Sequence, residues 1–160
     1  MTTTSLLDAI QVVKENERIA YQSYAEAAKT IRHSMGKELF TQLSEFEKHH
    51  FRILTALEKS LMEDDEYINY KGKAFPLPPK FEIKAAEEPN QKSVMKIISD
   101  AIDLEKQAEK AYTDLAAQIE DPQGHRMFLR LSEEEHNHYR ILNEAYWTLN
   151  DFGTWKWTRI

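Results

Sequence analysis

Glu47-Lys48-His49-His50 and Glu135-His136-Asn137-His138 are two copies of one Glu-x-x-His motif. Each copy lies on an apolar helical stripe and follows a glutamate on another such stripe, Glu17 before the first copy and Glu105 before the second. The offset is constant, since 105 − 17, 135 − 47 and 138 − 50 all give 88. Together the two sets supply four carboxylates and two imidazoles, the donors that a pair of metal ions takes from four helices.

Apolar residues recur every three or four positions along four segments, which is the period of a helix face. The segments around Glu17 and Glu105 match each other: Leu6, Ile10, Val13, Ala20, Tyr24, Ala27 and Ile31 in one, and Val94, Ile98, Ala101, Ala108, Tyr112, Leu115 and Ile119 in the other. Ser5 and Ser93 are predicted to cap these two helices. The sequence therefore predicts an all-α protein, a four-helix bundle made of two repeated helical hairpins.

Each hairpin is predicted to turn midway between its lone glutamate and its histidine. The midpoints fall beside Ser34-Met35-Gly36 and at Asp121-Pro122, a pair that breaks helices and forms turns. Between the hairpins, residues 64–92 contain several prolines and a glycine, which a continuous helix does not accommodate. We expect this segment to be a long crossover, the connection of ferritin-like bundles, instead of the short loop of an up-down bundle.

A single ferritin-like domain is expected over residues 1–160. Its predicted parts are a helical hairpin over 5–63, the crossover over 64–92, a second helical hairpin over 93–148 and a C-terminal tail over 149–160. The tail contains Trp155 and Trp157, and we expect it to pack on the bundle or on a second subunit.

Composition argues against several classes of protein. The chain has 21 Lys and Arg against 27 Asp and Glu, spread along the helices, so nucleic acid is not an expected partner. It contains no cysteine, so any redox metal must use O and N ligands. Residues 1–5 lack the features of a signal peptide, and no apolar stretch approaches the ~20 residues of a bilayer span. A soluble, cytoplasmic protein with no membrane partner is expected.

Glutamates buried without a counter-charge would destabilise this fold. Each ionised carboxylate in an apolar interior would cost several kcal/mol, against a net domain stability on the order of 10 kcal/mol. The four stripes contain no Lys or Arg, whereas two divalent ions carry the positive charge needed. Carboxylates with imidazoles suit Fe, Mn, Co or Zn. We therefore predict a dinuclear metal site whose ligands are Glu17, Glu47, His50, Glu105, Glu135 and His138.

Tyr24 and Tyr112 each follow the lone glutamate of their helix by seven residues, two turns along the same face. A buried tyrosine hydroxyl normally has a hydrogen-bond partner. We expect each hydroxyl to bond to a bridging carboxylate of the opposite hairpin and so to orient a metal ligand. The alternative is that the two tyrosine rings only pack in the core and that their hydroxyls have no role at the site.

Other polar residues near the motifs are expected to lie away from the ions. Glu45 and Glu133 match between the copies but lie off the ligand face, so a solvated position is favoured over a contact with an outer imidazole nitrogen. Surface or helix-end positions are expected for the remaining histidines, which have no counterpart in the other copy: His33, His49, His125 and His136.

At these residues the chain resembles the rubrerythrin-like branch of the ferritin-like diiron carboxylate proteins. The segments 17–24 and 105–112 resemble the first and third helices of that family, and the two Glu-x-x-His motifs resemble its second and fourth. The resemblance implies iron as the metal, with two ions in the site. It also implies the role of each ligand: Glu47 and Glu135 bridge the irons, Glu17 and His50 hold one iron, and Glu105 and His138 hold the other.

The chain departs from that family at two points. Rubrerythrins proper carry a rubredoxin-like domain whose iron is bound by four cysteines, and this chain has no cysteine. The electron donor is therefore expected to be a separate protein or Fe(II) itself. The family also uses an additional glutamate that exchanges with a histidine during redox change. The corresponding residue is Ala108, with Ala20 as its repeat equivalent, so that exchange has no counterpart here.

Several functions remain open. We favour a non-haem diiron oxidoreductase that reduces hydrogen peroxide or O₂, with electrons from an external donor. A ferroxidase that serves iron handling or storage is the second, although storage needs a closed shell of subunits. The third is a non-enzymatic bundle that is stapled by its ions and acts through a partner. Hydroxylation of a small substrate is a further alternative, and the expected assembly is a homodimer.

Overall fold

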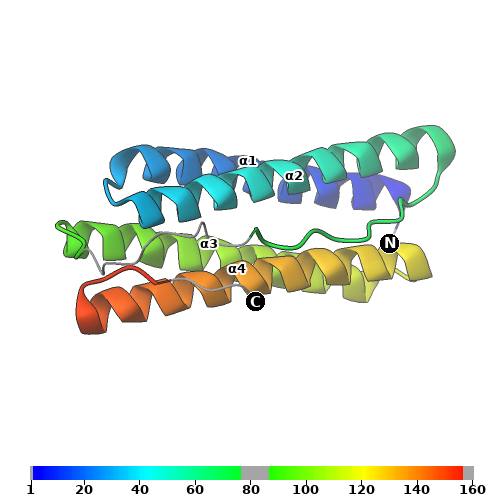
Figure 1. Ribbon diagram of the computed structural model, residues 1–160. Coiled ribbons are helices and arrows are strands. Elements are labelled where there is room, and N and C mark those ends of the chain that lie inside the picture. Colours follow the sequence, from blue (N-terminus) through cyan, green and yellow to red (C-terminus); the bar gives the residue numbers. More distant parts are fainter. Residues whose placement is uncertain (1, 77–86, 157–160) are drawn as a thin grey trace.

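The computed structural model describes residues 2–76 and 87–156 of the 160-residue chain (Figure 1). Within them the chain forms four helices: α1 (Thr3–Thr30), α2 (Ser34–Asp64), α3 (Gln91–Gln118) and α4 (Pro122–Phe152). α1 packs along α2 and α3 packs along α4, and the two hairpins lie against each other with residues 65–76, the described part of the crossover that follows α2, beside them (Figure 1). The predicted all-α fold, a ferritin-like four-helix bundle of two hairpins joined by a crossover, is confirmed.

The helix ends differ from the predictions because other residues provide the caps. The Thr2 hydroxyl accepts a 3.1 Å hydrogen bond from the Ser5 backbone N–H, so α1 begins before Ser5 and the prediction of Ser5 as its cap is wrong. Ser93 likewise lies inside α3, whose cap position is Asn90. α4 continues past residue 148 to Phe152 and ends where Gly153 adopts a left-handed conformation, with φ of 69°.

The first hairpin turns earlier than the midpoint rule predicted. Ser34-Met35-Gly36 form the first turn of α2, and the connection occupies residues 31–33. His33 favours this start because its Nδ1 accepts a 3.1 Å hydrogen bond from a backbone N–H of that turn. The second turn lies where it was predicted. Asp121 caps α4, and Pro122 takes the first helical position, where its missing N–H is not needed.

Two glycines at matching repeat positions let other segments approach the bundle. A Cβ atom on Gly36 would lie under 3.0 Å from the ring of Trp155, which belongs to the tail. A Cβ atom on Gly124 would lie equally close to the ring of Tyr67, which belongs to the crossover. Because Gly36 and Gly124 begin helices at opposite ends of the bundle (Figure 1), these two ring contacts lie at opposite ends as well.

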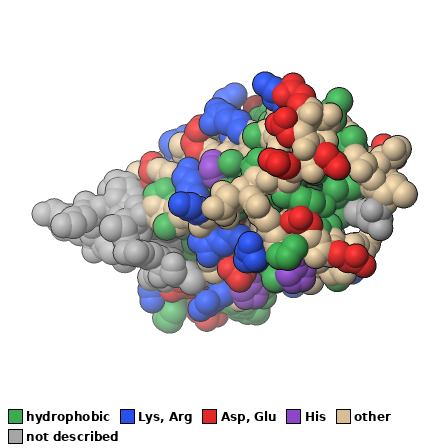
Figure 2. Space-filling view, turned by 90° about the vertical axis from the view of Figure 1, so that its right-hand side faces the viewer, with side chains coloured by type: hydrophobic (Ala, Val, Ile, Leu, Met, Phe, Trp, Pro, Cys, Tyr) green, Lys and Arg blue, Asp and Glu red, His purple; other side chains and the backbone are tan. Residues whose placement is uncertain are grey.

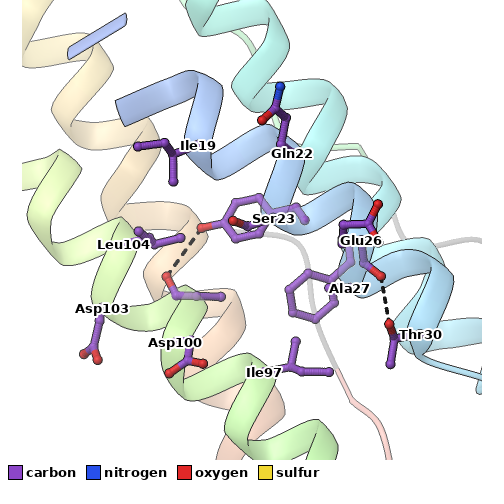
Figure 3. A pocket seen from close by; sticks show the side chains of 13 residues that line it. Ile19, Gln22, Ser23, Glu26, Ala27, Thr30, Ile97, Asp100, Asp103 and Leu104 are labelled. Carbon is purple, nitrogen blue, oxygen red and sulfur yellow. Dashed lines mark hydrogen bonds between the residues drawn. The ribbon is translucent and has the colours of Figure 1, made fainter. Parts of the chain in front are cut away.

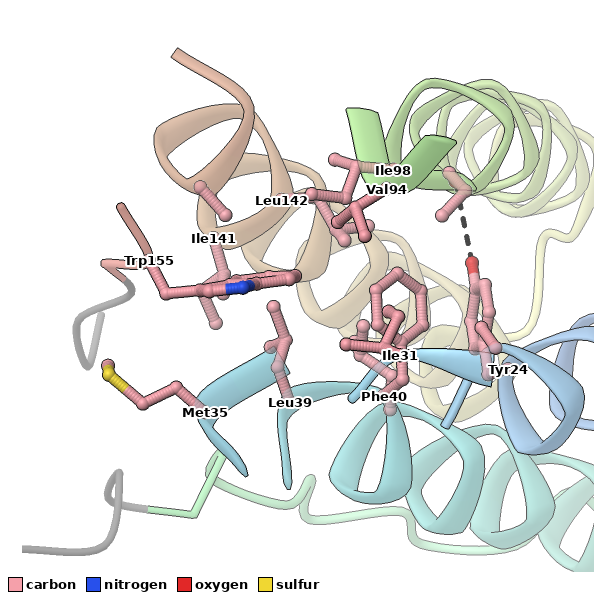
Figure 4. Close-up of a cluster of buried hydrophobic side chains, with 14 of the residues drawn as sticks. Tyr24, Ile31, Met35, Leu39, Phe40, Val94, Ile98, Ile141, Leu142 and Trp155 are labelled. Carbon is pink, nitrogen blue, oxygen red and sulfur yellow. Dashed lines mark hydrogen bonds between the residues drawn. The ribbon is translucent and has the colours of Figure 1, made fainter. Parts of the chain in front are cut away.

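The described part of the tail packs on its own bundle. Trp155 is buried, and its indole N–H donates a 2.9 Å hydrogen bond to the Glu88 carboxylate. Figure 4 shows the Trp155 ring among side chains of α2 and α4, including Leu39 and Ile141. Trp157 lies outside the described residues. Since Trp155 is enclosed by its own chain, it does not offer an apolar surface to a second subunit, and the homodimer stays a prediction.

The core consists of two apolar clusters with a polar layer between them. One cluster surrounds Trp155 and takes in the C-terminal half of α1 and the N-terminal half of α2. The other takes in the opposite halves of those helices, where Ile10 and Leu57 are fully buried. All four helices pass from one cluster to the other through a layer of buried glutamates and histidines. Burying these ionisable side chains in an otherwise apolar core costs free energy unless they are paired.

The outer surface carries charges of both signs. Figure 2 shows Lys and Arg side chains next to Asp and Glu side chains on one end of the molecule. Within the described residues, α1–α4 all lack an apolar window of the length that crossing a membrane requires. The cytoplasmic location and the absence of a nucleic-acid partner stay predictions.

Candidate metal centre

Six buried residues from four helices converge in the polar layer. Because positions i and i+3 share a helix face, each Glu-x-x-His motif points a carboxylate and an imidazole in one direction. α1 and α3 each add one glutamate from the opposite side of the bundle. None of these side chains is more than 2% exposed: Glu17, Glu47, His50, Glu105, Glu135 and His138.

The six residues form two overlapping groups, each with ligand atoms that all lie within 4.8 Å of one another. One group consists of Glu17, Glu47, His50 and Glu135, and the other of Glu47, Glu105, Glu135 and His138. Glu47 and Glu135 belong to both groups, whereas each group has its own second glutamate and its own histidine. This is the arrangement that two neighbouring ions with two shared carboxylates require.

Both imidazoles direct Nδ1 at the carboxylates. His50 Nδ1 lies 2.6 Å from a Glu135 oxygen and 3.5 Å from a Glu17 oxygen. His138 Nδ1 lies 2.7 Å from a Glu47 oxygen and 3.6 Å from a Glu105 oxygen. Each histidine is thus closest to the shared glutamate of the other hairpin, so the site joins the two hairpins.

The donor set fits a pair of metal ions. Several buried ligand atoms have no hydrogen-bond partner among the described residues: Glu17 Oε2, Glu47 Oε2, His50 Nδ1, Glu105 Oε2 and Glu135 Oε1. His50 Nδ1 approaches Glu135 closely but without hydrogen-bond geometry. Buried polar atoms without partners are costly, and a cation supplies the missing interaction for all of these atoms.

Without metal, protons must balance the charge of this cluster. Burial and the charge of Glu47 raise the pKa of Glu17 well above its usual value. Burial and the charge of Glu105 do the same for the pKa of Glu135. For Glu47, burial acts in the same direction, but the neighbouring Glu17 carboxyl group and the charge of His138 outweigh burial and hold the pKa of Glu47 well below its usual value. The metal-free site therefore mixes protonated and ionised carboxyl groups.

Each predicted tyrosine reaches the opposite hairpin, but its acceptor differs from the prediction. The Tyr24 hydroxyl donates a 2.8 Å hydrogen bond to Glu105, and the Tyr112 hydroxyl donates to Glu17. Both acceptors are the unshared glutamates, so the expectation of a bridging carboxylate is wrong. The seven-residue spacing, two helical turns, brings each hydroxyl to the unshared glutamate of the opposite hairpin. Burial, with the charge of the accepting glutamate, raises the pKa of both phenols, which remain neutral donors.

Glu134 is a buried partner of the site that the sequence analysis missed. Its carboxylate accepts a 3.0 Å hydrogen bond from His50 Nε2 and a 2.9 Å hydrogen bond from the Lys73 backbone N–H. Glu45 and Glu133, which match between the copies, are both exposed, as expected. The signal that could have identified Glu134 is a difference between the copies. Where the first copy has Phe46 on a buried helix face, the second copy has a glutamate.

The four other histidines take no part in the cluster. Each has a local partner: a backbone N–H for His33, the Tyr70 hydroxyl for His49, a backbone carbonyl for His125 and an α3 carboxylate for His136. His49 is connected to the site through its partner, because the Tyr70 hydroxyl also donates to Glu134.

A small cavity of about 110 Å³ lies against the cluster between α1 and α3, with Ala20 and Ala108 in its lining. Ala108 is the position of the additional glutamate in the family that the sequence resembles. A wider cleft of about 650 Å³ lies between the same helices, and Ile19, Tyr24 and Leu104 line both spaces. Figure 3 shows Ile19 and Leu104 on facing walls of the cleft. The cavity at the cluster has room for a small molecule and not for a large one.

Fold and site together define a class of protein: a four-helix bundle with a buried carboxylate and histidine cluster suited to metal ions. The family model for rubrerythrin matches residues 1–86 and 96–152, and the chain belongs to the rubrerythrin family. The fold is shared with the hypothetical protein Pfu-1136390-001 from Pyrococcus furiosus, with a TM-score of 0.67 and 23% identity over 97% of this chain and 94% of that chain. No curated protein sequence matches the chain significantly.

Proposed function

We propose that the protein is a non-haem diiron oxidoreductase that reduces hydrogen peroxide or O₂ with electrons from an external donor. The observation that carries the proposal is that two four-residue ligand groups share Glu47 and Glu135. Two Fe(II) ions held by these groups would supply two electrons together, which with two protons reduce one hydrogen peroxide to two waters.

The six residues would form two metal positions. Glu17 and His50 would hold one iron, Glu105 and His138 the other, and the two shared glutamates would bridge them. Four carboxylates balance two divalent ions, which removes the uncompensated charge from the core. Membership of the rubrerythrin family supports iron, with Mn, Co and Zn as substitutes that the same donors accept.

The surroundings of the ligands suit a small oxidant. Tyr24 and Tyr112 hold the unshared glutamates by hydrogen bonds, which fixes one carboxylate orientation in each group. Ala20 and Ala108 leave the cavity of about 110 Å³ next to the ligands, enough for hydrogen peroxide or O₂. The sequence contains no cysteine, so we propose that electrons come from a separate donor protein or from Fe(II) itself.

An anaerobic Fe(II) titration of the metal-free protein, followed by hydrogen peroxide or O₂ in parallel, tests the proposal. The expected result is saturation near two irons per chain and oxidation by peroxide much faster than by O₂, followed by absorbance. Uptake far beyond two irons would instead favour a ferroxidase that feeds iron storage. Two tightly bound ions that neither oxidant changes would favour the non-enzymatic, metal-stapled bundle. Absence of specific metal binding would overturn the dinuclear site.

A further inference from the structure

The repeat that builds the site is broken beside its two histidines. Every ligand lies 88 positions from its counterpart, and the same offset relates residue 134 to residue 46. Position 134 is a glutamate and position 46 is a phenylalanine, and both side chains are buried. The difference therefore changes the surroundings of the imidazoles and not the surface of the protein.

On one side, a carboxylate backs the histidine. Glu134 is 2% exposed and lies 3.0 Å from the outer nitrogen of His50, Nε2. It accepts hydrogen bonds from two donors of the crossover, the Tyr70 hydroxyl and the Lys73 backbone N–H, and it forms an ion pair with Arg130 Nε, 3.3 Å away on the preceding turn of α4. With these donors around it, Glu134 is set to accept the proton on Nε2, which leaves Nδ1 free for a metal ion.

On the other side, aromatic rings take the place of the carboxylate. Nε2 of His138 is buried and has no hydrogen-bond partner in the part of the chain that the structure describes. The Phe46 ring lies edge-on to this imidazole at 4.4 Å between centroids, and the Phe75 ring lies at 5.4 Å. Phe46 and Phe75 stack on each other, so this contact is a packed apolar wall.

We infer that Glu134 is a positioning residue that makes the two metal positions unequal. The position formed with His50 binds its ion more tightly, and the position formed with His138 releases its ion first. A carboxylate that accepts the outer N–H of a ligating histidine fixes the ring and raises the basicity of the metal-binding nitrogen, and loss of such a partner weakens metal binding about 10–100-fold. The inference rests on the proposed dinuclear site and adds an order of occupancy to it.

The arrangement also attaches the crossover to the tighter position. Tyr70 and Lys73 contact the ligand shell through Glu134, and they do so on the His50 side. An ion at this position therefore stabilises the docked crossover as well as the helices.

Titration of the metal-free protein with Co(II), followed by visible absorbance, tests the inference without any turnover. The wild-type protein should bind one ion tightly and a second about 10–100-fold more weakly. Glu134→Gln keeps the size and the hydrogen-bond acceptor but removes the charge, and it should weaken the first step until the two steps merge. Glu45→Gln, which removes an exposed carboxylate of α2 that pairs with Lys48, is the matched control and should leave both steps unchanged.

Two further variants assign the effect to one histidine. His138→Ala should keep the tight ion and His50→Ala should keep only the weak one, a comparison that holds even if Glu134→Gln fails to fold. Glu134→Gln should weaken binding in the His138→Ala background and have no effect in the His50→Ala background. Two equal wild-type sites, or an equal effect in both backgrounds, would overturn the inference alone. A wild-type protein that binds no Co(II) or Fe(II) would overturn the proposed function and the inference with it.

Discussion

The hydroxyl of Tyr24 on α1 donates a 2.8 Å hydrogen bond to the carboxylate of Glu105 on α3. Tyr112 on α3 and Glu17 on α1 form the reciprocal pair, so two buried hydrogen bonds of the same kind cross from one hairpin to the other. Each bond occupies one oxygen of a carboxylate whose second oxygen has no partner in the described structure. One oxygen of each unshared glutamate thus remains available to a metal ion.

We predict that Tyr24→Phe and Tyr112→Phe each weaken metal binding by about 10–100-fold, because the unshared glutamate loses the bond that orients it. Co(II) titration of the metal-free variants measures the effect. Tyr21→Phe is the control, since Tyr21 lies on the same helix at a partly exposed position and its ring contacts Phe51. Unchanged affinity in both buried variants would show that the hydroxyls serve packing alone.

The sharing of ligands predicts different metal counts for two glutamate variants. Glu17 belongs to one ligand group and Glu47 to both. Glu17→Gln should therefore leave one ion per chain after dialysis, whereas Glu47→Gln should weaken both positions and leave less than one. Metal analysis of the dialysed proteins gives the counts. Equal losses from the two variants would contradict the assignment of Glu47 as a shared ligand.

The metal-free protein should lose stability as the pH rises. Burial lowers the pKa of His138, but the charges of Glu105 and Glu47 outweigh burial and raise it from 6.5 to about 9. Between these values the folded state binds more protons than the unfolded state, so the stabilisation is complete below about pH 6.5 and is lost by about pH 9. The raised pKa values of Glu17 and Glu135 act in the same direction above their ordinary value of 4.5.

Thermal unfolding of the metal-free protein at pH 6 and pH 9 measures this loss as a lower Tm at pH 9. The metal-loaded protein is the control, because its ions replace the protons and its Tm should fall much less. The depressed pKa of Glu47 acts at the acid end, where stability is lost as the pH falls below about 4.5. A metal-free Tm that is equal at pH 6 and pH 9 would contradict the pKa shift of His138.

The cavity beside Ala108 predicts how the oxidant reaches the ligands. Ala108→Leu adds three carbons to the lining of a space of about 110 Å³, so it should slow oxidation of the bound Fe(II) by hydrogen peroxide at least several-fold while two irons still bind. Stopped-flow absorbance measures the rate. Ala117→Leu, at an exposed position of the same helix, is the control. Oxidation at the wild-type rate in Ala108→Leu would place the route elsewhere.

The repeat made the bundle and its polar layer predictable from sequence. Periodicity reports which residues share a helix face, and a constant offset reports which faces are equivalent, so the convergence of Glu17 and Glu47 with their copies followed from the pattern. One detail that the pattern missed lies where the copies differ. Glu134 was overlooked because its counterpart is Phe46, and a search for matching residues passes over such a position.

The repeat could not predict the helix caps, the acceptors of the tyrosines or the aromatic contacts of the glycines, for a different reason. The choice between Thr2 and Ser5 as the cap of α1 depends on local backbone geometry, and both residue types are good caps. The acceptors of the two tyrosines depend on how the hairpins are staggered, which a repeat within one chain does not report. Gly36 and Gly124 match between the copies, and their aromatic partners, Trp155 and Tyr67, are also 88 positions apart, but these two rings lie in the tail and the crossover, where the helical period places no side chain.

Gly36 therefore offers a sharp test of how the tail docks. A Cβ atom at this position would lie under 3.0 Å from the Trp155 ring, so Gly36→Ala should destabilise the protein by about 1–3 kcal/mol through overpacking. In an open helical position the same change stabilises by about 1 kcal/mol, because alanine is the better helix former. In a Trp155→Ala background, which removes the ring, Gly36→Ala should consequently be neutral or stabilising. Urea unfolding of the two single variants and the double variant measures this change of sign. An equal cost of Gly36→Ala with and without the indole would contradict the docking of Trp155 against the start of α2.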